Sequence, residues 1–209
     1  MEWYRKTSWS ENDKNEFFEK LKRARDYNKA QYLLIQAGTL VSTKNPNLLD
    51  VAEDLLNKML SEFPNERGQQ SPALNSLGDI YKIRGNYDKA IECYKKSLKF
   101  EEDFPNTITN SYLDFSELIV KMQKTDEYDY AEKLLENEIP ESLFPVTKYK
   151  GFTILAIINY HKGNSDKAKI YENLAEENAN AKTTNLRYHK YLGLVKKRDS
   201  WLDKLIKKK

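Results

Sequence analysis

The stretch SPALNSLGDIYKIRGNYDKAIECYKKSL, residues 71–98, decides the fold that the sequence predicts. Apolar and small residues recur in it at the three- and four-residue intervals of an α-helix, in two successive runs. Gly85 and Asn86 separate the runs, and both residue types tolerate the left-handed backbone that ends many helices. Ser71 and Pro72 are typical of a helix start, as N-cap and first helical residue. The stretch therefore predicts two helices joined by a tight turn.

The same stretch resembles a tetratricopeptide repeat, whose pattern is W-x2-L-G-x2-Y followed by A-x3-F. The matching residues, with leucine in place of the tryptophan, are Leu74, Leu77, Gly78, Tyr81, Ala90 and Tyr94. Gly78 and Ala90 are small where two helices would cross closely, and the larger residues would fill the space beside the crossing. The resemblance implies an all-α fold, a right-handed α-solenoid of helical hairpins, that binds other proteins.

Four alanines mark equivalent small positions along the chain and predict four hairpins. They are Ala52, Ala90, Ala131 and Ala168, spaced by 38, 41 and 37 residues. These spacings slightly exceed the 34 residues of the consensus repeat, so the extra residues should lie in turns. The predicted repeats span residues 28–64, 71–102, 108–139 and 145–180. With an N-terminal capping helix in residues 1–27 and a basic capping helix in residues 183–209, we expect a single domain of about ten or eleven helices.

The register of the first hairpin has two interpretations. Residues 28–42 fit the first helix of a repeat, because Leu34, Ala37, Gly38 and Val41 occupy its signature positions. Residues 26–37 also align with residues 86–97, which would make the same helix the second member of an earlier pair. Both interpretations give a continuous stack of helices.

The resemblance implies a concave groove lined by the first helix of each hairpin. In such proteins, residues one turn apart on these helices meet the partner. The predicted partner-binding residues are Tyr32, Ile35, Thr39, Asn75, Asp79, Lys82, Ser116, Val120, Thr153, Ile157, Tyr160 and His161, and the same positions include Ile83, Gln123 and Lys150. Any one of them could instead pack against a neighbouring helix. The mixture of apolar and polar side chains suits a bound protein or peptide.

No motif in the sequence predicts catalysis or a cofactor. The phosphate-binding, zinc-protease and nucleophile-elbow patterns are absent. His161 and His189 have no cysteine or acidic residue at metal-ligand spacing. Cys93, the single cysteine, excludes an internal disulfide, and we expect it to be an inert, buried thiol. We therefore expect no enzymatic activity, no cofactor and no metal.

Positive charge gathers at the C-terminal end of the chain. Residues 182–209 carry ten Lys or Arg against two Asp, a net charge of +8 that leaves −5 for the rest of the chain. This segment could mark a contact with nucleic acid or an acidic partner, or it could be a solvated capping helix. Tyr188, Tyr191 and Trp201 follow helical spacing, so we expect them to pack in the core. That expectation argues against nucleic acid as a partner.

The composition predicts a cytoplasmic protein. No apolar run approaches the length of a membrane span, and the start MEWYRKTSWSEND lacks the apolar stretch of a signal peptide. The predicted function is a monomeric adaptor or scaffold that binds a partner protein in its groove. One alternative is a dedicated inhibitor, such as an immunity protein or a regulatory subunit that neutralises an enzyme or toxin. The other is a nucleic-acid regulator that acts through the basic C-terminal helix.

Overall fold

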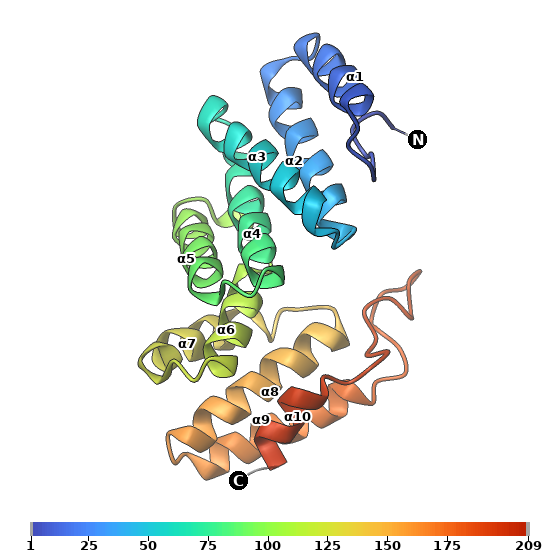
Figure 1. The fold of residues 1–209 in the computed structure, drawn as a ribbon. Helices are drawn as coiled ribbons and strands as arrows, with labels where there is room; N and C mark the ends of the chain where they lie inside the picture. The colour runs from blue at the N-terminus through green and yellow to red at the C-terminus, as the bar shows by residue number, and fades with distance from the viewer. Residues whose placement is uncertain (1, 208–209) are drawn as a thin grey trace. The chain divides into compact units, whose positions relative to one another are not determined.

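The computed structural model describes residues 2–207, and this part of the chain contains helices, turns and no strand (Figure 1). The α-helices are α1 (Glu11–Lys22), α2 (Asp26–Ser42), α3 (Pro46–Glu62), α4 (Arg67–Ile83), α5 (Tyr87–Asp103), α6 (Ser111–Lys121), α7 (Tyr128–Glu138), α8 (Pro145–His161), α9 (Ser165–Ala179) and α10 (Ser200–Lys207). Two short 3-10 helices, η1 (Pro105–Thr107) and η2 (Thr125–Glu127), lie in connections. The all-α prediction is confirmed.

Consecutive helices pack in pairs, most extensively α2 with α3, α4 with α5 and α8 with α9. The four pairs cover residues 26–62, 67–103, 111–138 and 145–179, within four residues of the predicted repeats. Tight turns join the paired helices, and Gly85 and Gly163 adopt φ values of 76° and 78° in them. Glycine is favoured at both positions because a side chain disfavours this left-handed backbone.

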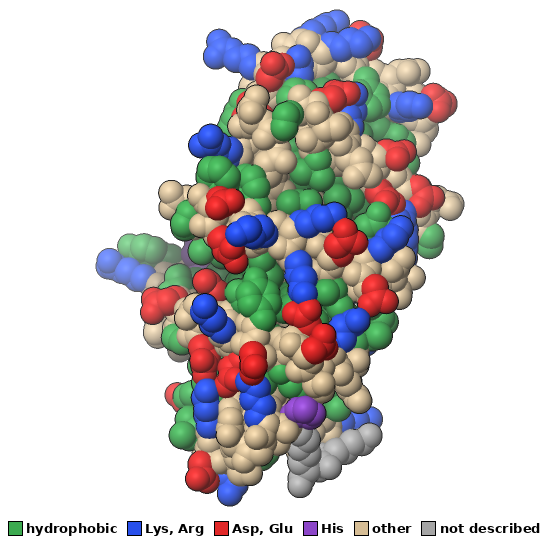
Figure 2. All heavy atoms as spheres, turned by 90° about the vertical axis from the view of Figure 1, so that its left-hand side faces the viewer, with side chains coloured by type: hydrophobic (Ala, Val, Ile, Leu, Met, Phe, Trp, Pro, Cys, Tyr) green, Lys and Arg blue, Asp and Glu red, His purple; other side chains and the backbone are tan. Residues whose placement is uncertain are grey.

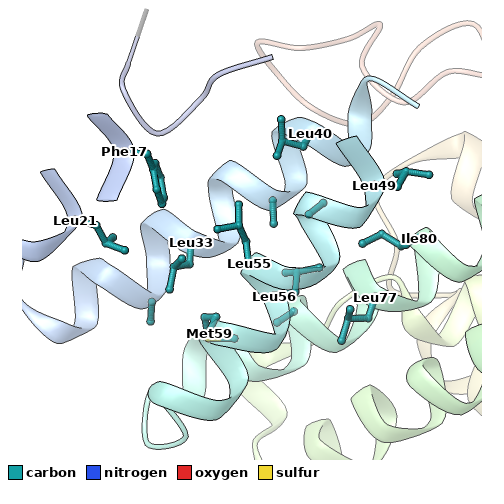
Figure 3. Packing of buried hydrophobic residues seen from close by; sticks show 14 residues of the cluster. Phe17, Leu21, Leu33, Leu40, Leu49, Leu55, Leu56, Met59, Leu77 and Ile80 are labelled. Carbon is teal, nitrogen blue, oxygen red and sulfur yellow. The ribbon is translucent and has the colours of Figure 1, made fainter. Parts of the chain in front are cut away.

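Contacts divide the chain into two compact units, Met1–Ser111 and Tyr112–Lys209, which we describe separately. In unit 1, helices α1 to α4 bury one apolar cluster, part of which Figure 3 shows. Its labelled members are Phe17, Leu21, Leu33, Leu40, Leu49, Leu55, Leu56, Met59, Leu77 and Ile80. Helix α2 packs far more extensively against α3 than against α1. Residues 28–42 therefore form the first helix of the α2–α3 hairpin, which resolves the ambiguous register.

The paired helices cross at the small residues, as predicted. All four marker alanines, Ala52, Ala90, Ala131 and Ala168, are fully buried. A Cβ atom added to Gly78 would lie 2.3 Å from a ring carbon of Tyr94, so only glycine fits at this crossing. At Gly38, the equivalent position of α2, an added Cβ meets nothing within 4 Å. The two glycines differ because their partner helices differ. Gly78 faces Tyr94 of α5, whereas α3, the partner of α2, carries the smaller Leu56 at the equivalent position.

The predicted start of α4 is wrong by one turn. The helix begins at Arg67 and contains Pro72. Ser71 is not an N-cap but is fully buried, and its hydroxyl lies 2.8 Å from the Ser97 hydroxyl on α5. At the sixth helical residue a proline removes the backbone hydrogen bond to the carbonyl of Gly68 and crowds that carbonyl, at a cost of about 3 kcal/mol. The extensive packing of α4 against α5 offsets this cost.

The predicted capping helix over residues 183–209 is much too long. Only Ser200–Lys207 is helical, residues 181–199 form turns, and the last two residues lie outside the described part of the chain. Gly193 has a φ of 73°, and an added Cβ would lie 2.4 Å from the Phe144 ring. This left-handed backbone interrupts the helical periodicity on which the prediction rested. At the other end, α1 is present, and Ser10 and Asp13 form its capping box.

Candidate peptide-binding face

The N-terminal segment covers one of the predicted groove residues on α2. The Tyr32 ring centroid lies 4.8 Å from that of Trp3 and 4.6 Å from that of Tyr4. Gln36 is fully buried and exchanges two hydrogen bonds with the backbone of Lys6, of 2.9 and 2.8 Å. These contacts fasten the segment along α2. Tyr32 is therefore part of the packing of the N-terminal segment.

The predicted residues further along α2 are partly exposed. Ile35 is half-buried. Thr39 is half-buried too, and its hydroxyl donates to the Ile35 carbonyl at 2.8 Å. This internal bond satisfies the hydroxyl hydrogen. The second half of α2 therefore offers a mainly apolar surface.

The predicted residues on α4 are partly exposed as well, and two of them are held by side-chain hydrogen bonds. Asn75 donates to the Ser111 hydroxyl at 3.0 Å, and Asp79 accepts from the buried Tyr94 hydroxyl at 2.8 Å. Lys82 is half-buried, and Ile83 is 41% exposed. Because α2 and α4 pack against each other, unit 1 carries two neighbouring first helices whose groove positions are at least partly accessible.

In unit 2, four of the predicted groove residues are buried: Ser116, Val120, Thr153 and Ile157. The two hydroxyl groups among them donate to backbone carbonyls of their own helices, at 2.7 and 2.6 Å. At the end of α8, Tyr160 is half-buried and donates to Glu172 at 2.7 Å. His161 is exposed and meets the Tyr128 ring edge-on, at 5.1 Å between centroids. Of the predicted groove residues on α8, His161 at the end of the helix is the exposed one.

The chain's own C-terminal segment covers the first half of α8. The Tyr149 hydroxyl donates to Asp203 at 2.9 Å and accepts from the backbone N–H of Asp199 at 3.0 Å. Lys150, another predicted groove residue, forms an ion pair with Asp199 at 3.0 Å. Leu202 of α10 is fully buried. Burial, with the hydrogen bond to Asp203, raises the pKa of Tyr149 to about 12, so the phenol stays protonated as a donor.

Replacing Tyr149 by phenylalanine is expected to loosen α10 while leaving α8 packed. The change removes both hydrogen bonds of the hydroxyl but keeps the ring, so docking of α10 should weaken by about 1–2 kcal/mol. Hydrogen–deuterium exchange should then be roughly tenfold faster in residues 200–207 than in the unchanged protein. Tyr160→Phe, which removes a hydrogen bond to Glu172, is the matched control. Equal exchange of α10 in all three proteins would contradict this role of Tyr149.

A recurring ion-pair arrangement joins each of two helices to the hairpin that follows it. In unit 1, Asp50 and Glu53 of α3 both bind the guanidinium of Arg84, at the end of α4, and Glu53 also accepts from Tyr81. Burial by itself raises the pKa of Glu53, but hydrogen bonds from Tyr81 and Arg84 outweigh it and lower the pKa. The arrangement fixes the distance between α3 and the turn after α4.

Unit 2 repeats the arrangement with a lysine. Asp129 and Glu132 of α7 both bind the Lys162 ammonium, and Glu132 also pairs with Lys167 at 2.7 Å. Repeat spacing did not predict these contacts, yet the sequence carries a signal for them. The pattern Asp-x-Ala-Glu stands at residues 50–53 and 129–132. The cation that binds its glutamate follows 31 or 30 residues later and directly precedes Gly-Asn. On the face shown in Figure 2, acidic and basic side chains lie interspersed. The charged side chains of α3 and α7 thus form ion pairs with the following hairpin, which stabilise the packing of the helices.

The described residues offer little reactive chemistry. Among them there is no group of three or more His, Cys, Asp or Glu side chains placed to hold a metal ion. Cys93 is partly buried, and burial raises the pKa of its thiol to about 11, which keeps it protonated and weakly nucleophilic near neutral pH. Within residues 2–207, no helix is both long and apolar enough to span a bilayer.

Comparison with known families agrees with the geometry of unit 1. The family model described as the tetratricopeptide repeat matches residues 71–104. The match covers most of α4 and all of α5, the pair in which Gly78 faces Tyr94. Helix pairs of the same kind precede and follow it in the sequence. The chain is therefore an all-helical protein of paired helices whose residues 71–104 form a tetratricopeptide repeat.

Proposed function

We propose that the chain is a protein-binding adaptor and that a peptide or partner helix binds along α2 and α4 of unit 1. Tetratricopeptide repeats generally mediate protein–protein interactions. The observation that carries the placement is accessibility: Ile35, Thr39, Lys82 and Ile83 are partly exposed, whereas four of the eight predicted groove residues of unit 2, Ser116, Val120, Thr153 and Ile157, are buried. Two isoleucines beside polar groups suit apolar anchoring with hydrogen bonds for orientation.

Introducing charge at the apolar anchors tests this placement. The partner would be identified by affinity capture with the full chain followed by mass spectrometry, and its affinity then measured with purified proteins. Ile35→Asp together with Ile83→Asp should weaken binding at least about tenfold, because each buries a charge in an apolar contact. Ile170→Asp on α9, whose side chain is 60% exposed, is the matched control. Unchanged affinity of the double variant for the partner would refute the proposal that the partner binds along α2 and α4.

The rival function is an inhibitor that neutralises a partner enzyme or toxin. It rests on the net charge of −5 outside residues 182–209, which would complement a basic active-site region. The two functions differ in what the captured partner does afterwards. An inhibitor abolishes the partner's activity at equimolar concentration, whereas an adaptor leaves that activity intact and joins the partner to a further protein.

A further inference from the structure

The segment between α9 and α10 forms a loop that is fastened at both ends. At its base, the Thr184 N–H donates to the Lys190 carbonyl at 2.7 Å, and the Thr184 hydroxyl donates to the His189 carbonyl at 3.1 Å. At its other end, the Gly193 carbonyl accepts a hydrogen bond of 2.8 Å from the backbone N–H of Val146, which lies at the start of α8. Residues 185–192 therefore project from a fixed base in unit 2.

The loop displays two tyrosines to solvent. Tyr188 is 80% exposed and Tyr191 is 75% exposed, more than any other large hydrophobic residue in the described part of the chain. The guanidinium of Arg187 lies 5.2 Å from the centre of the Tyr188 ring. Residues 187–192 together line an open hollow of about 480 Å³. The expectation that these tyrosines pack in the core was wrong, so it no longer argues against nucleic acid as a partner.

Among the described residues, five cations without an ion-pair partner lie in the same segment as the two rings. Residues 182–198 contain no Asp or Glu. Of the cations in this segment, Arg198 binds Glu176 and Asp203. Within residues 2–207 no ion-pair partner approaches the others, which are Lys182, Arg187, Lys190, Lys196 and Lys197. Residues 182–197 thus carry two exposed rings, with Arg187 and Lys190 beside them in the sequence, and five cations in all that no carboxylate of the described chain neutralises.

We propose that residues 182–197 bind single-stranded nucleic acid. Such a strand alternates anionic phosphates with flat bases, and exposed aromatic rings flanked by Lys and Arg are the side chains that stack on bases and neutralise phosphates. An acidic peptide would satisfy the cations but would offer no flat partner to both tyrosines. A bilayer would require an apolar side segregated from a basic side, whereas here rings and cations alternate along the loop. This surface is independent of the proposed groove on α2 and α4.

Binding of a fluorescein-labelled oligouridine of about 15 nucleotides to the full chain tests the proposal, followed by fluorescence anisotropy. If five phosphates are neutralised, affinity should fall roughly 100-fold between about 50 and about 200 mM salt. Tyr188→Ala with Tyr191→Ala should weaken binding at least about tenfold. Tyr188→Phe with Tyr191→Phe should bind like the unchanged protein, because the rings that stack remain.

Charge variants and other anions complete the test. Lys196→Glu with Lys197→Glu should weaken binding at least about tenfold, while the same reversal at the exposed Lys133 and Lys169 should change it little. Circular dichroism establishes that each variant is folded. The proposal fails if the alanine variant binds the oligonucleotide as well as the phenylalanine variant does. It also fails if phosphatidylserine vesicles, polyglutamate or a second copy of the chain bind the loop more tightly than the oligonucleotide.

Discussion

Gly78→Ala is expected to destabilise the protein by about 2 kcal/mol. The added methyl group would lie 2.3 Å from Tyr94, whose ring is fully buried and whose hydroxyl is held by Asp79. Forcing an extra methyl group into such packing costs about 1–3 kcal/mol, and more where the ring has no room to move. The higher helix propensity of alanine offsets about 1 kcal/mol of that cost. Chemical denaturation of both proteins measures the difference.

Gly38→Ala is the matched control for this prediction, because an added Cβ there meets nothing within 4 Å. The propensity gain should then act alone and stabilise the protein by up to about 1 kcal/mol. Two glycines at equivalent repeat positions should therefore respond with opposite signs. If both variants were stabilised, the steric account of Gly78 would be refuted.

A second change separates the clash with Tyr94 from other effects of the alanine. Tyr94→Leu introduces at this crossing the residue type that α3 carries as Leu56. In the unchanged background it should be destabilising, because the ring leaves a cavity and Asp79 loses its donor. In the Gly78→Ala background it should cost at least about 1 kcal/mol less, because it also relieves the clash. Strict additivity of the two changes would show that the ring is not what excludes the methyl group.

The helix pairs could be predicted from local sequence because their signals are local. The last predicted repeat spans residues 145–180, and α8 and α9 occupy 145–179. Buried small residues such as Ala90, and turns such as Gly85–Asn86, specify crossings and ends without reference to the rest of the chain. The start of α4 was missed because Ser71 has an equally favourable use, as a buried hydrogen-bond partner of α5.

The accessible surface could not be predicted in the same way, because accessibility depends on what packs from elsewhere. Thr153 occupies a groove position in the repeat, yet it is buried and lies beside α10, whose Ile206 lines the same small cavity. Tyr32 is likewise covered by Trp3 and Tyr4, from a segment that no repeat pattern describes. Periodicity assigns a side chain to a helix face, but it does not say whether the chain's own ends cover that face.

The helical spacing of the C-terminal aromatics misled for a related reason. Tyr188 and Tyr191 recur at an interval of three residues, which a helix and a closed loop produce equally well. The left-handed backbone at Gly193 and its contact with Phe144 favour the loop. A glycine after an apolar run is a helix stop signal, and here this signal outweighs the helical spacing of Tyr188 and Tyr191.

The second large effect is expected from Glu132→Gln, at about 2–3 kcal/mol of lost stability near pH 7, because one partner of a partly buried ion-pair network is removed. Burial by itself raises the pKa of this carboxyl, but hydrogen bonds from Lys162, Lys167 and Asn159 outweigh it and lower the pKa from 4.5 to about 2. The side chain is only 11% exposed, so solvent screens these contacts weakly. Glutamine has the same shape as glutamate but no charge. Lys162 and Lys167 would therefore face a neutral amide in place of the carboxylate.

The pH dependence distinguishes lost charge from disturbed packing. A carboxyl group whose pKa is lower in the folded than in the unfolded protein stabilises the fold above its unfolded pKa, and the contribution disappears as the pH falls through the folded value. The stability difference between wild type and Glu132→Gln should therefore be full above about pH 5 and shrink steadily toward about pH 2. Glu141→Gln, at an exposed residue, should cost less than about 0.5 kcal/mol at any pH. A difference between wild type and Glu132→Gln that stays constant from about pH 7 to about pH 3 would mean that the amide disturbs packing and that the ion pairs with Lys162 and Lys167 contribute little.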